Sequence, residues 1–180
     1  MRLPDKTDDD VRLGVAIAVP EPYGSALQVA RASFGDPLAA LIPAHVTLLG
    51  PTVRPVAARG DIDAHLRSVA ARHEPFTLHL RGTATFRPVS PVVFVQVVAG
   101  IAGCEQLEAD VRSGILAEGR EFNYHPHVTV AHELDDDALD LAFERLAGFD
   151  ASFEVEAFWL FDHGVDGKWR PAQEYRLGER

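Results

Sequence analysis

The stretch HVTL at residues 45–48 has a near copy, HVTV, at residues 127–130, 82 residues further along the chain. In a β-strand, side chains two residues apart point to the same face of the sheet. The second and fourth residues of each stretch would face a core, and the histidine and threonine would face the opposite way. We therefore predict two strands that present two imidazoles, His45 and His127, and two hydroxyls, Thr47 and Thr129, to one shared cleft.

The sequence around each copy repeats one order of elements. Apolar runs and helical spacing predict strand, helix, strand, helix, strand in the first half, and the same order plus one strand in the second. Strands are expected over 11–19, 45–49, 76–81, 91–98, 127–131, 153–161 and 169–177, and helices over 22–34, 61–73, 101–118 and from the caps at 135–137 to Gly148. The pattern predicts an α+β fold of two pseudo-symmetric lobes. Each lobe is an antiparallel sheet with helices packed outside, and the central cleft carries the two His-x-Thr motifs.

The length of 180 residues, with 47% hydrophobic and 24% charged residues, is typical of one globular unit. No Ser/Gly-rich linker separates the halves. We therefore expect a single bilobal domain over 1–180, with a flexible polar tail at 1–10.

Charge and cysteine content exclude several classes of protein. The net charge is −10, from 17 basic and 27 acidic residues, so a broad basic face for long nucleic acid is not expected, whereas a small or terminal phosphate could be held in a local pocket. A single cysteine, Cys104, excludes a disulfide scaffold and a multi-cysteine zinc site. No apolar run reaches the ~18 residues of a membrane span, and the first ten residues are too acidic for a secretory signal. We expect a cytoplasmic monomer with no membrane association.

Two imidazoles and two hydroxyls suit phosphodiester chemistry. Such a reaction needs a base for the attacking oxygen and an acid for the leaving oxygen, and imidazole, with an ordinary pKa of ~6.5, serves either role near neutrality. Each positioned acid or base contributes ~10²–10⁴-fold in rate. The threonine hydroxyls can donate to the non-bridging phosphate oxygens, where charge builds up. This set of residues requires no metal or other cofactor.

The two motifs resemble those of the 2H phosphoesterases, which include the bacterial 2′-5′ RNA ligase and cyclic phosphodiesterase enzymes. The stretches AHVTLLGP (44–51) and YHPHVTVAH (124–132) carry the resemblance, and the whole chain agrees in length and element order. It implies a bilobal fold, metal-independent hydrolysis of 2′,3′-cyclic phosphates with reversible 2′-5′ RNA ligation, and catalysis by His45 and His127 with Thr47 and Thr129. By this resemblance His127 is the base and His45 the acid, and the product is a 2′-phosphate. The partner is then a cyclic-phosphate nucleotide or an RNA terminus.

Four other residues are candidates for substrate binding. His125 shares the strand face of His127 if that strand starts early, and Phe122 and Tyr124 precede the motif in a loop that could border the cleft, where a base can stack on an aromatic ring. Arg87, in a rigid Phe-Arg-Pro connection, is a candidate for a second phosphate contact. Strict alternation instead places His132 on the face opposite His127.

Two other functions compete with this interpretation. A non-catalytic module could use the cleft to bind a nucleotide or a phosphate. A metal-dependent hydrolase could use His125 and His127, because His-x-His also occurs in metal enzymes, although no third ligand is recognisable.

Overall fold

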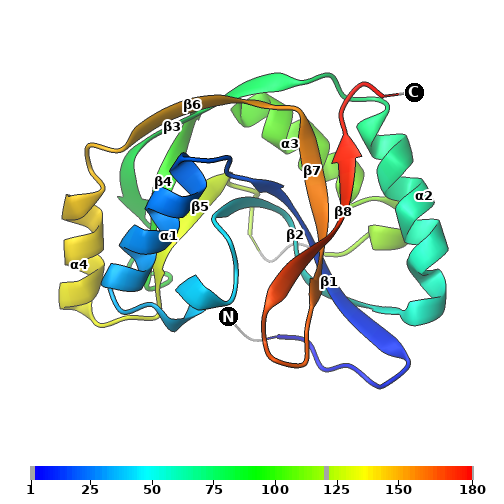
Figure 1. Ribbon diagram of the computed structural model, residues 1–180, viewed down its shortest axis with the longest axis horizontal. Helices are drawn as coiled ribbons and strands as arrows, with labels where there is room; N and C mark the ends of the chain where they lie inside the picture. The colour runs from blue at the N-terminus through cyan, green and yellow to red at the C-terminus, as the bar shows by residue number, and fades with distance from the viewer. Residues whose placement is uncertain (1–2, 120–121, 180) are drawn as a thin grey trace.

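The computed structural model describes residues 3–119 and 122–179, and its frame is a pair of four-stranded antiparallel sheets (Figure 1). The strands of the first sheet, in spatial order, are β2 (His45–Pro55), β1 (Asp10–Ala18), β7 (Ala157–His163) and β8 (Trp169–Arg176). Those of the second sheet are β5 (His127–His132), β4 (Val92–Ala99), β3 (Phe76–Thr85) and β6 (Asp150–Val155). The two motif strands, β2 and β5, are each the edge strand of one sheet, and they contact each other.

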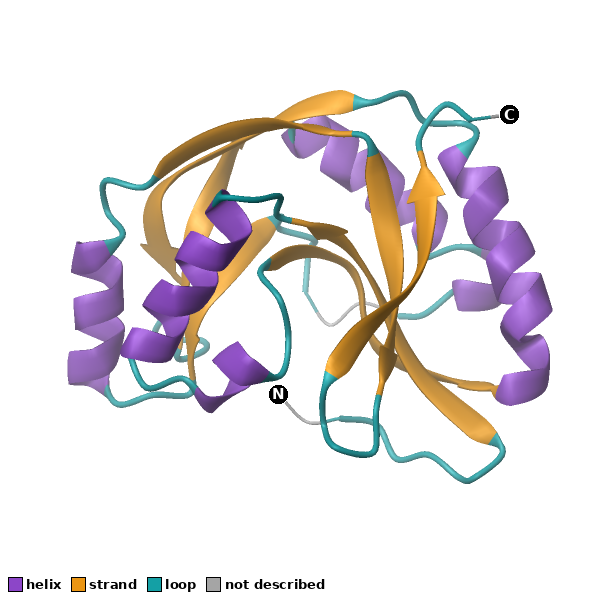
Figure 2. Ribbon diagram, in the orientation of Figure 1, coloured by secondary structure: helices purple, strands orange, loops and turns teal. Residues whose placement is uncertain are grey.

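The helices lie on the outer sides of the two sheets (Figure 2). Helix α4 (Asp136–Arg145) contacts β3, β4 and β5, and α1 (Tyr23–Ser33) contacts β5. On the other side, α2 (Arg59–Ala70) contacts β8 and α3 (Ile101–Val111) contacts β2. The predicted α+β fold of two antiparallel sheets with outer helices is confirmed.

The two sheets do not correspond to the two halves of the chain. Strand β3, from the first half, pairs with β4 and β6 in the second sheet, and β7, from the second half, pairs with β1 in the first sheet. The single strand predicted over 153–161 is wrong for the same reason. The chain leaves the second sheet at Val155, passes Glu156 and enters the first sheet at Ala157. Strands β6 and β7 are both extended and partly apolar, so the sequence pattern does not reveal that the chain passes from one sheet to the other between them.

Two predicted ends also differ from the structure. Strand β2 continues through Gly50-Pro51, because these residues fall in a register shift between the pairs Val15–Leu49 and Leu13–Thr52, where proline interrupts no ladder hydrogen bond. The helix predicted to reach 118 ends at Val111, and Gly114 follows it with a left-handed φ of 53°. A short 3₁₀ turn, Gly114–Leu116, completes the segment.

The two motif strands share one irregularity. In β2, Thr47 pairs with Ala16 and Leu49 with Val15, so Leu48 is an extra residue in the ladder. In β5, Thr129 pairs with Phe94 and Ala131 with Val93, so Val130 is extra. A bulge at the same place in each motif shifts the alternation of all residues that follow.

The polar tail expected at 1–10 has no helix before β1 in its described part, which begins at Leu3. Residues 1–2 lie outside the described residues, and the Pro4 carbonyl accepts hydrogen bonds from Arg12.

At the predicted cap near residue 135, the Asp135 side chain accepts from the Ala138 backbone N–H at 2.8 Å and begins α4.

Candidate active site

A cavity of about 680 Å³ opens between the two sheets, and both motif strands line it. Its volume is in the range of small-molecule sites. Its wall includes His45, Thr47, His127 and Thr129, the four residues that the repeat predicted would meet. Val46 and Val128 are fully buried on the opposite face, as alternation requires.

Each motif histidine is held by the same hydrogen bond. His45 Nδ1 lies 2.7 Å from the Pro43 carbonyl oxygen, and His127 Nδ1 lies 2.7 Å from the His125 carbonyl oxygen. A carbonyl oxygen only accepts, so Nδ1 must carry the proton in both rings. In the neutral form, each ring therefore presents the lone pair of Nε2. This tautomer lets each imidazole accept a proton at Nε2, or donate one from there once it is protonated.

Burial favours the neutral form of both rings. Burial, with smaller contributions from repulsion by Arg31 and His127, lowers the pKa of His45 to about 4, although the hydrogen bond to Pro43 favours the protonated ring. The pKa of His127 is lowered mainly by burial as well. Repulsion by His127 is one of the smaller causes of the lowered pKa of His45, as expected for two imidazoles that line one cavity. A bound anion between them would reverse this effect and favour protonation.

Two phenylalanines fix the ring of His127. Phe86 meets it edge-on, with centroids 5.0 Å apart and planes at 89°, and Phe94 lies at the same centroid distance. These rings exclude water from one side of the imidazole, which accounts for the burial that lowers its pKa.

The hydroxyls of Thr47 and Thr129 are free to bind a ligand. Both residues line the cavity, and no other described side chain or backbone group hydrogen-bonds either hydroxyl. Tyr124 joins the two motifs, since its hydroxyl donates to the Thr47 carbonyl at 3.0 Å. Tyr124 therefore lines the cavity and also holds the loop before β5 against β2.

The structure brings Phe122 and His125 to the cavity wall with Tyr124. Phe122 is 66% exposed, and the His125 ring stacks on that of His127 with centroids 6.2 Å apart. Among the described residues, no group of three or more His, Cys, Asp or Glu side chains is arranged to hold a metal ion.

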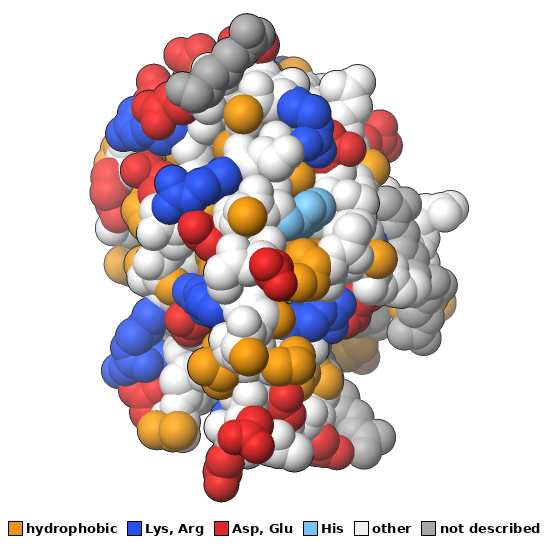
Figure 3. Space-filling model, turned by 90° about the vertical axis from the view of Figure 1, so that its right-hand side faces the viewer, with side chains coloured by type: hydrophobic (Ala, Val, Ile, Leu, Met, Phe, Trp, Pro, Cys, Tyr) orange, Lys and Arg blue, Asp and Glu red, His pale blue; other side chains and the backbone are white. Residues whose placement is uncertain are grey.

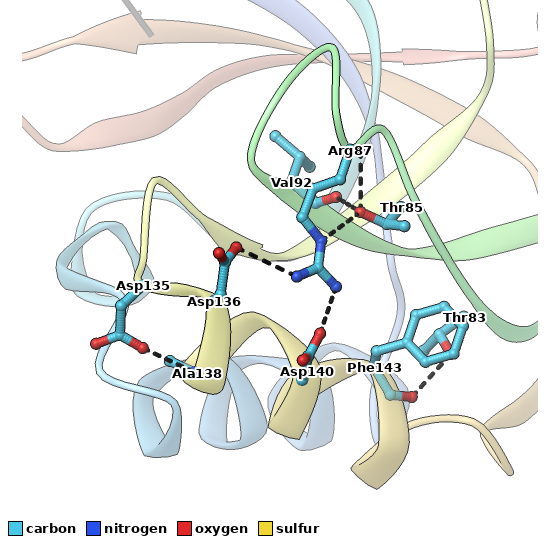
Figure 4. Close-up of polar contacts among 9 residues, drawn as sticks. All are labelled: Thr83, Thr85, Arg87, Val92, Asp135, Asp136, Ala138, Asp140 and Phe143. Atoms are coloured by element: carbon cyan, nitrogen blue, oxygen red, sulfur yellow. Dashed lines mark hydrogen bonds and ion pairs between the residues drawn. The ribbon is translucent and has the colours of Figure 1, made fainter.

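The structure does not bring Arg87 to the cavity, whose described wall omits it. Its guanidinium points instead to α4 (Figure 4), where it donates to Asp140 at 2.6 Å and to Asp136 at 3.4 Å. Thr85 holds the same residue from the strand side. Arg87 therefore ties the loop before β4 to α4, and the predicted phosphate contact has no support in its position.

His132 is one of several described cavity residues that the sequence patterns did not predict. The extra residue at Val130 turns His132 to the same side as His127, so the predicted opposite face is wrong. Its Nδ1 is buried without a partner among the described residues, and burial lowers its pKa. In the first repeat, Gly50 takes the matching position. A β-bulge has no signature in the sequence, so the sequence could not show that His132 faces the cavity.

Arg31 and Arg112 line the cavity as well, and they too were not predicted. Arg31 lies 14 residues before His45, and Arg112 lies 15 residues before His127. An alignment of the two repeats beyond their motifs could have found this pair.

The fold and the paired motifs define a two-histidine phosphoesterase. More particularly, the chain belongs to the 2′-5′ RNA ligase superfamily, whose sequence profile matches residues 19–167. A Bacillus cytotoxicus protein named “Putative phosphoesterase” is 30% identical over 146 residues, which are 80% of this chain and 84% of the relative.

Solved structures agree in fold. TT0787 of Thermus thermophilus has a TM-score of 0.67 at 24% identity, covering 93% of this chain and 98% of that one. Apo LigT of E. coli has a TM-score of 0.66 at 23% identity, covering 96% and 100%.

Two further features concern the surface and the helices of the protein. The face that carries α2 mixes acidic and basic side chains (Figure 3). Within residues 3–119 and 122–179, no helix has the length and hydropathy to span a membrane.

Proposed function

We propose that this phosphoesterase hydrolyses 2′,3′-cyclic phosphates, on a nucleotide or an RNA end, by acid–base catalysis between His45 and His127. The observation that carries the proposal is the matched pair of Nδ1–carbonyl hydrogen bonds, which aims two equivalent Nε2 atoms at one cavity. Family membership supports phosphoester chemistry in general. Structures of E. coli LigT with 3′-AMP and with phosphate support a nucleotide-type ligand.

In the proposed reaction, Thr47 and Thr129 donate hydrogen bonds to the two non-bridging oxygens of the cyclic phosphate. One neutral imidazole takes a proton from water at Nε2 as the water oxygen forms a bond to phosphorus. The other imidazole, protonated, gives its Nε2 proton to the ribose oxygen as the old P–O bond breaks. We assign the base role to His127 and the acid role to His45, so that the 3′-oxygen leaves and a 2′-phosphate remains. With a 5′-hydroxyl in place of water as the attacking group, the same steps would form a 2′-5′ linkage.

Because burial lowers the pKa of His45 to about 4, His45 is neutral in the free protein at pH 7. Its acid role therefore requires that His45 take up a proton from solvent when the anionic substrate binds. This protonation is electrostatically favourable, since a phosphate close to the ring raises its pKa.

The test is a substrate panel of 2′,3′-cyclic mononucleotides, oligoribonucleotides with a cyclic end, and 2′-5′-linked dinucleotides. We expect turnover by the wild type, a fall in kcat of about 10²–10⁴-fold in His45→Ala and in His127→Ala, and a smaller fall in Thr47→Val and Thr129→Val. His79→Gln, outside the cavity, is the matched control. Unchanged rates in both histidine variants would contradict the proposal.

The same panel separates the alternatives. Nucleotide binding without turnover of any member would indicate a binding module. Loss of activity in EDTA that a divalent ion restores would indicate the metal hydrolase based on His125 and His127. We expect EDTA to leave the rate unchanged, and gel filtration to show the monomer that the sequence predicts.

A further inference from the structure

Two arginines line the cavity outside the His–Thr pairs, and each is anchored in the same way. Arg31, in the last turn of α1, donates from Nε to the Asp36 carboxylate at 2.8 Å. Arg112, directly after α3, donates from Nε to the Glu108 carboxylate at 2.8 Å. Both carboxylates are buried, with exposed fractions of 3% and 1%. Each guanidinium is therefore held at one nitrogen, and the plane of its fork is fixed.

The terminal nitrogens of both arginines have no partner in the described protein. Apart from the Nε bonds, no hydrogen bond of the described residues uses a guanidinium nitrogen of either one. The Arg31 side chain is only 5% exposed, and Arg31 lines the cavity. An ion pair built for stability usually engages the carboxylate with the two-nitrogen fork. Here the terminal nitrogens of both arginines are left without an acceptor among the described residues, and both arginines line the cavity.

The two arginines are equivalent in the internal repeat. Arg31 is carried by α1, which packs against β5, and Arg112 follows α3, which packs against β2. Each arginine therefore comes to the cavity beside the motif strand of the other repeat. Both arginines therefore line the cavity that holds His45 and His127, and the repulsion of His45 by Arg31 agrees with a short distance between these two.

We propose that Arg31 and Arg112 are two anion subsites, which bind phosphate groups of the substrate that flank the reacting one. A guanidinium fork with two free nitrogens is the protein group best suited to a phosphate. The proposal rests on the proposed function and narrows its substrate class. The preferred substrate carries at least one phosphate besides the scissile group, as an oligonucleotide end or a 5′-phosphorylated nucleotide does, and a nucleoside cyclic phosphate without a further phosphate is a poor substrate.

The test compares two probes by calorimetry. One is a 2′-5′-linked diadenylate with no other phosphate, and the other is the same molecule with a phosphate at each outer end. Binding is measured in the His127→Ala background, which prevents cleavage of the diester. We expect the outer phosphates to tighten binding about 100-fold, and Arg31→Lys and Arg112→Gln each to lose about tenfold of this gain, where tenfold is about 1.4 kcal/mol.

Two further variants control for charge and folding. Arg67→Gln removes an equal charge from the exposed side of α2 and should keep the whole gain. Arg31→Gln with Asp36→Asn removes the buried pair without leaving a carboxylate alone, and thermal unfolding establishes that it is folded. No gain from the outer phosphates, or a gain that all arginine variants retain, would overturn the proposal. Failure of turnover alone would contradict the proposed function and leave this binding result intact.

Discussion

At the residue scale, the site depends on which atom of each histidine is left free. The sequence could predict His45 and His127 on one face, because alternation along a strand is a property of the backbone. It could not predict the Nδ1 hydrogen bonds, which depend on where the carbonyls of Pro43 and His125 point. Arg31 was hidden for another reason. It lies in a helix whose apolar spacing indicates a buried face, and that pattern carries no information about a buried arginine with a carboxylate five residues later.

The lowered pKa values of the two histidines predict how stability depends on pH. Between pH 6.5 and the lower pKa of the folded protein, the unfolded chain binds protons that the folded chain does not. The free energy of unfolding therefore rises with pH in this window, which for His45 extends from 6.5 down to about 4. We expect the midpoint of thermal unfolding to fall as the pH is lowered from 7 to 5, and His45→Gln to reduce this slope. An equal slope in His45→Gln and in the wild type, with His79→Gln as the control, would contradict the lowered pKa.

At the element scale, the structure differs from the sequence patterns where the pairing of strands decides. The helix that Asp135 caps begins where its capping residue predicted. The bulges at Leu48 and Val130 and the passage between sheets at Glu156 could not be predicted, since each results from contacts with a strand distant in the chain. Capping residues and apolar spacing predict where a helix or strand begins, whereas the register of a strand depends on the strand with which it pairs.

The cap of α4 gives a prediction at this scale. Asp135→Ala removes the acceptor of the Ala138 N–H and should lower the free energy of unfolding by about 1 kcal/mol. Urea unfolding monitored by circular dichroism measures this change. Asp135→Asn, which keeps an acceptor oxygen, should lose less. Asp135 is not part of the described cavity wall. The Asp135→Ala variant should therefore have the same activity in the substrate panel as the wild type. A loss of activity would show that α4 positions the site.

At the scale of the whole molecule, the exchange of strands between repeats makes each sheet depend on both halves of the chain. The first half supplies β1 and β2 to one sheet, and β3 to the interior of the other. The second half supplies β7 and β8, without which β1 has an open edge. The sequence pattern predicted two sheets and a cleft. It could not predict the order of the strands in each sheet, because the apolar alternation of β3 fits either sheet.

This exchange predicts the behaviour of the separated halves. Fragments 1–90 and 91–180, divided in the loop at the exposed Val89, should each fail to fold alone. Mixed, they should regain the circular dichroism spectrum and a cooperative unfolding transition. A cooperative transition in either fragment by itself would show that a half-chain builds its own core and would contradict the prediction.

The matched anchoring of His45 and His127 also bears on the direction of the proposed chemistry. By microscopic reversibility, opening a phosphodiester and sealing one pass through the same barrier, with donor and acceptor interchanged. Each histidine must therefore act as the acid in one direction and as the base in the other, and the matched anchoring leaves Nε2 of both rings able to do so. Water activity and the supply of free ends would then decide whether it opens or seals.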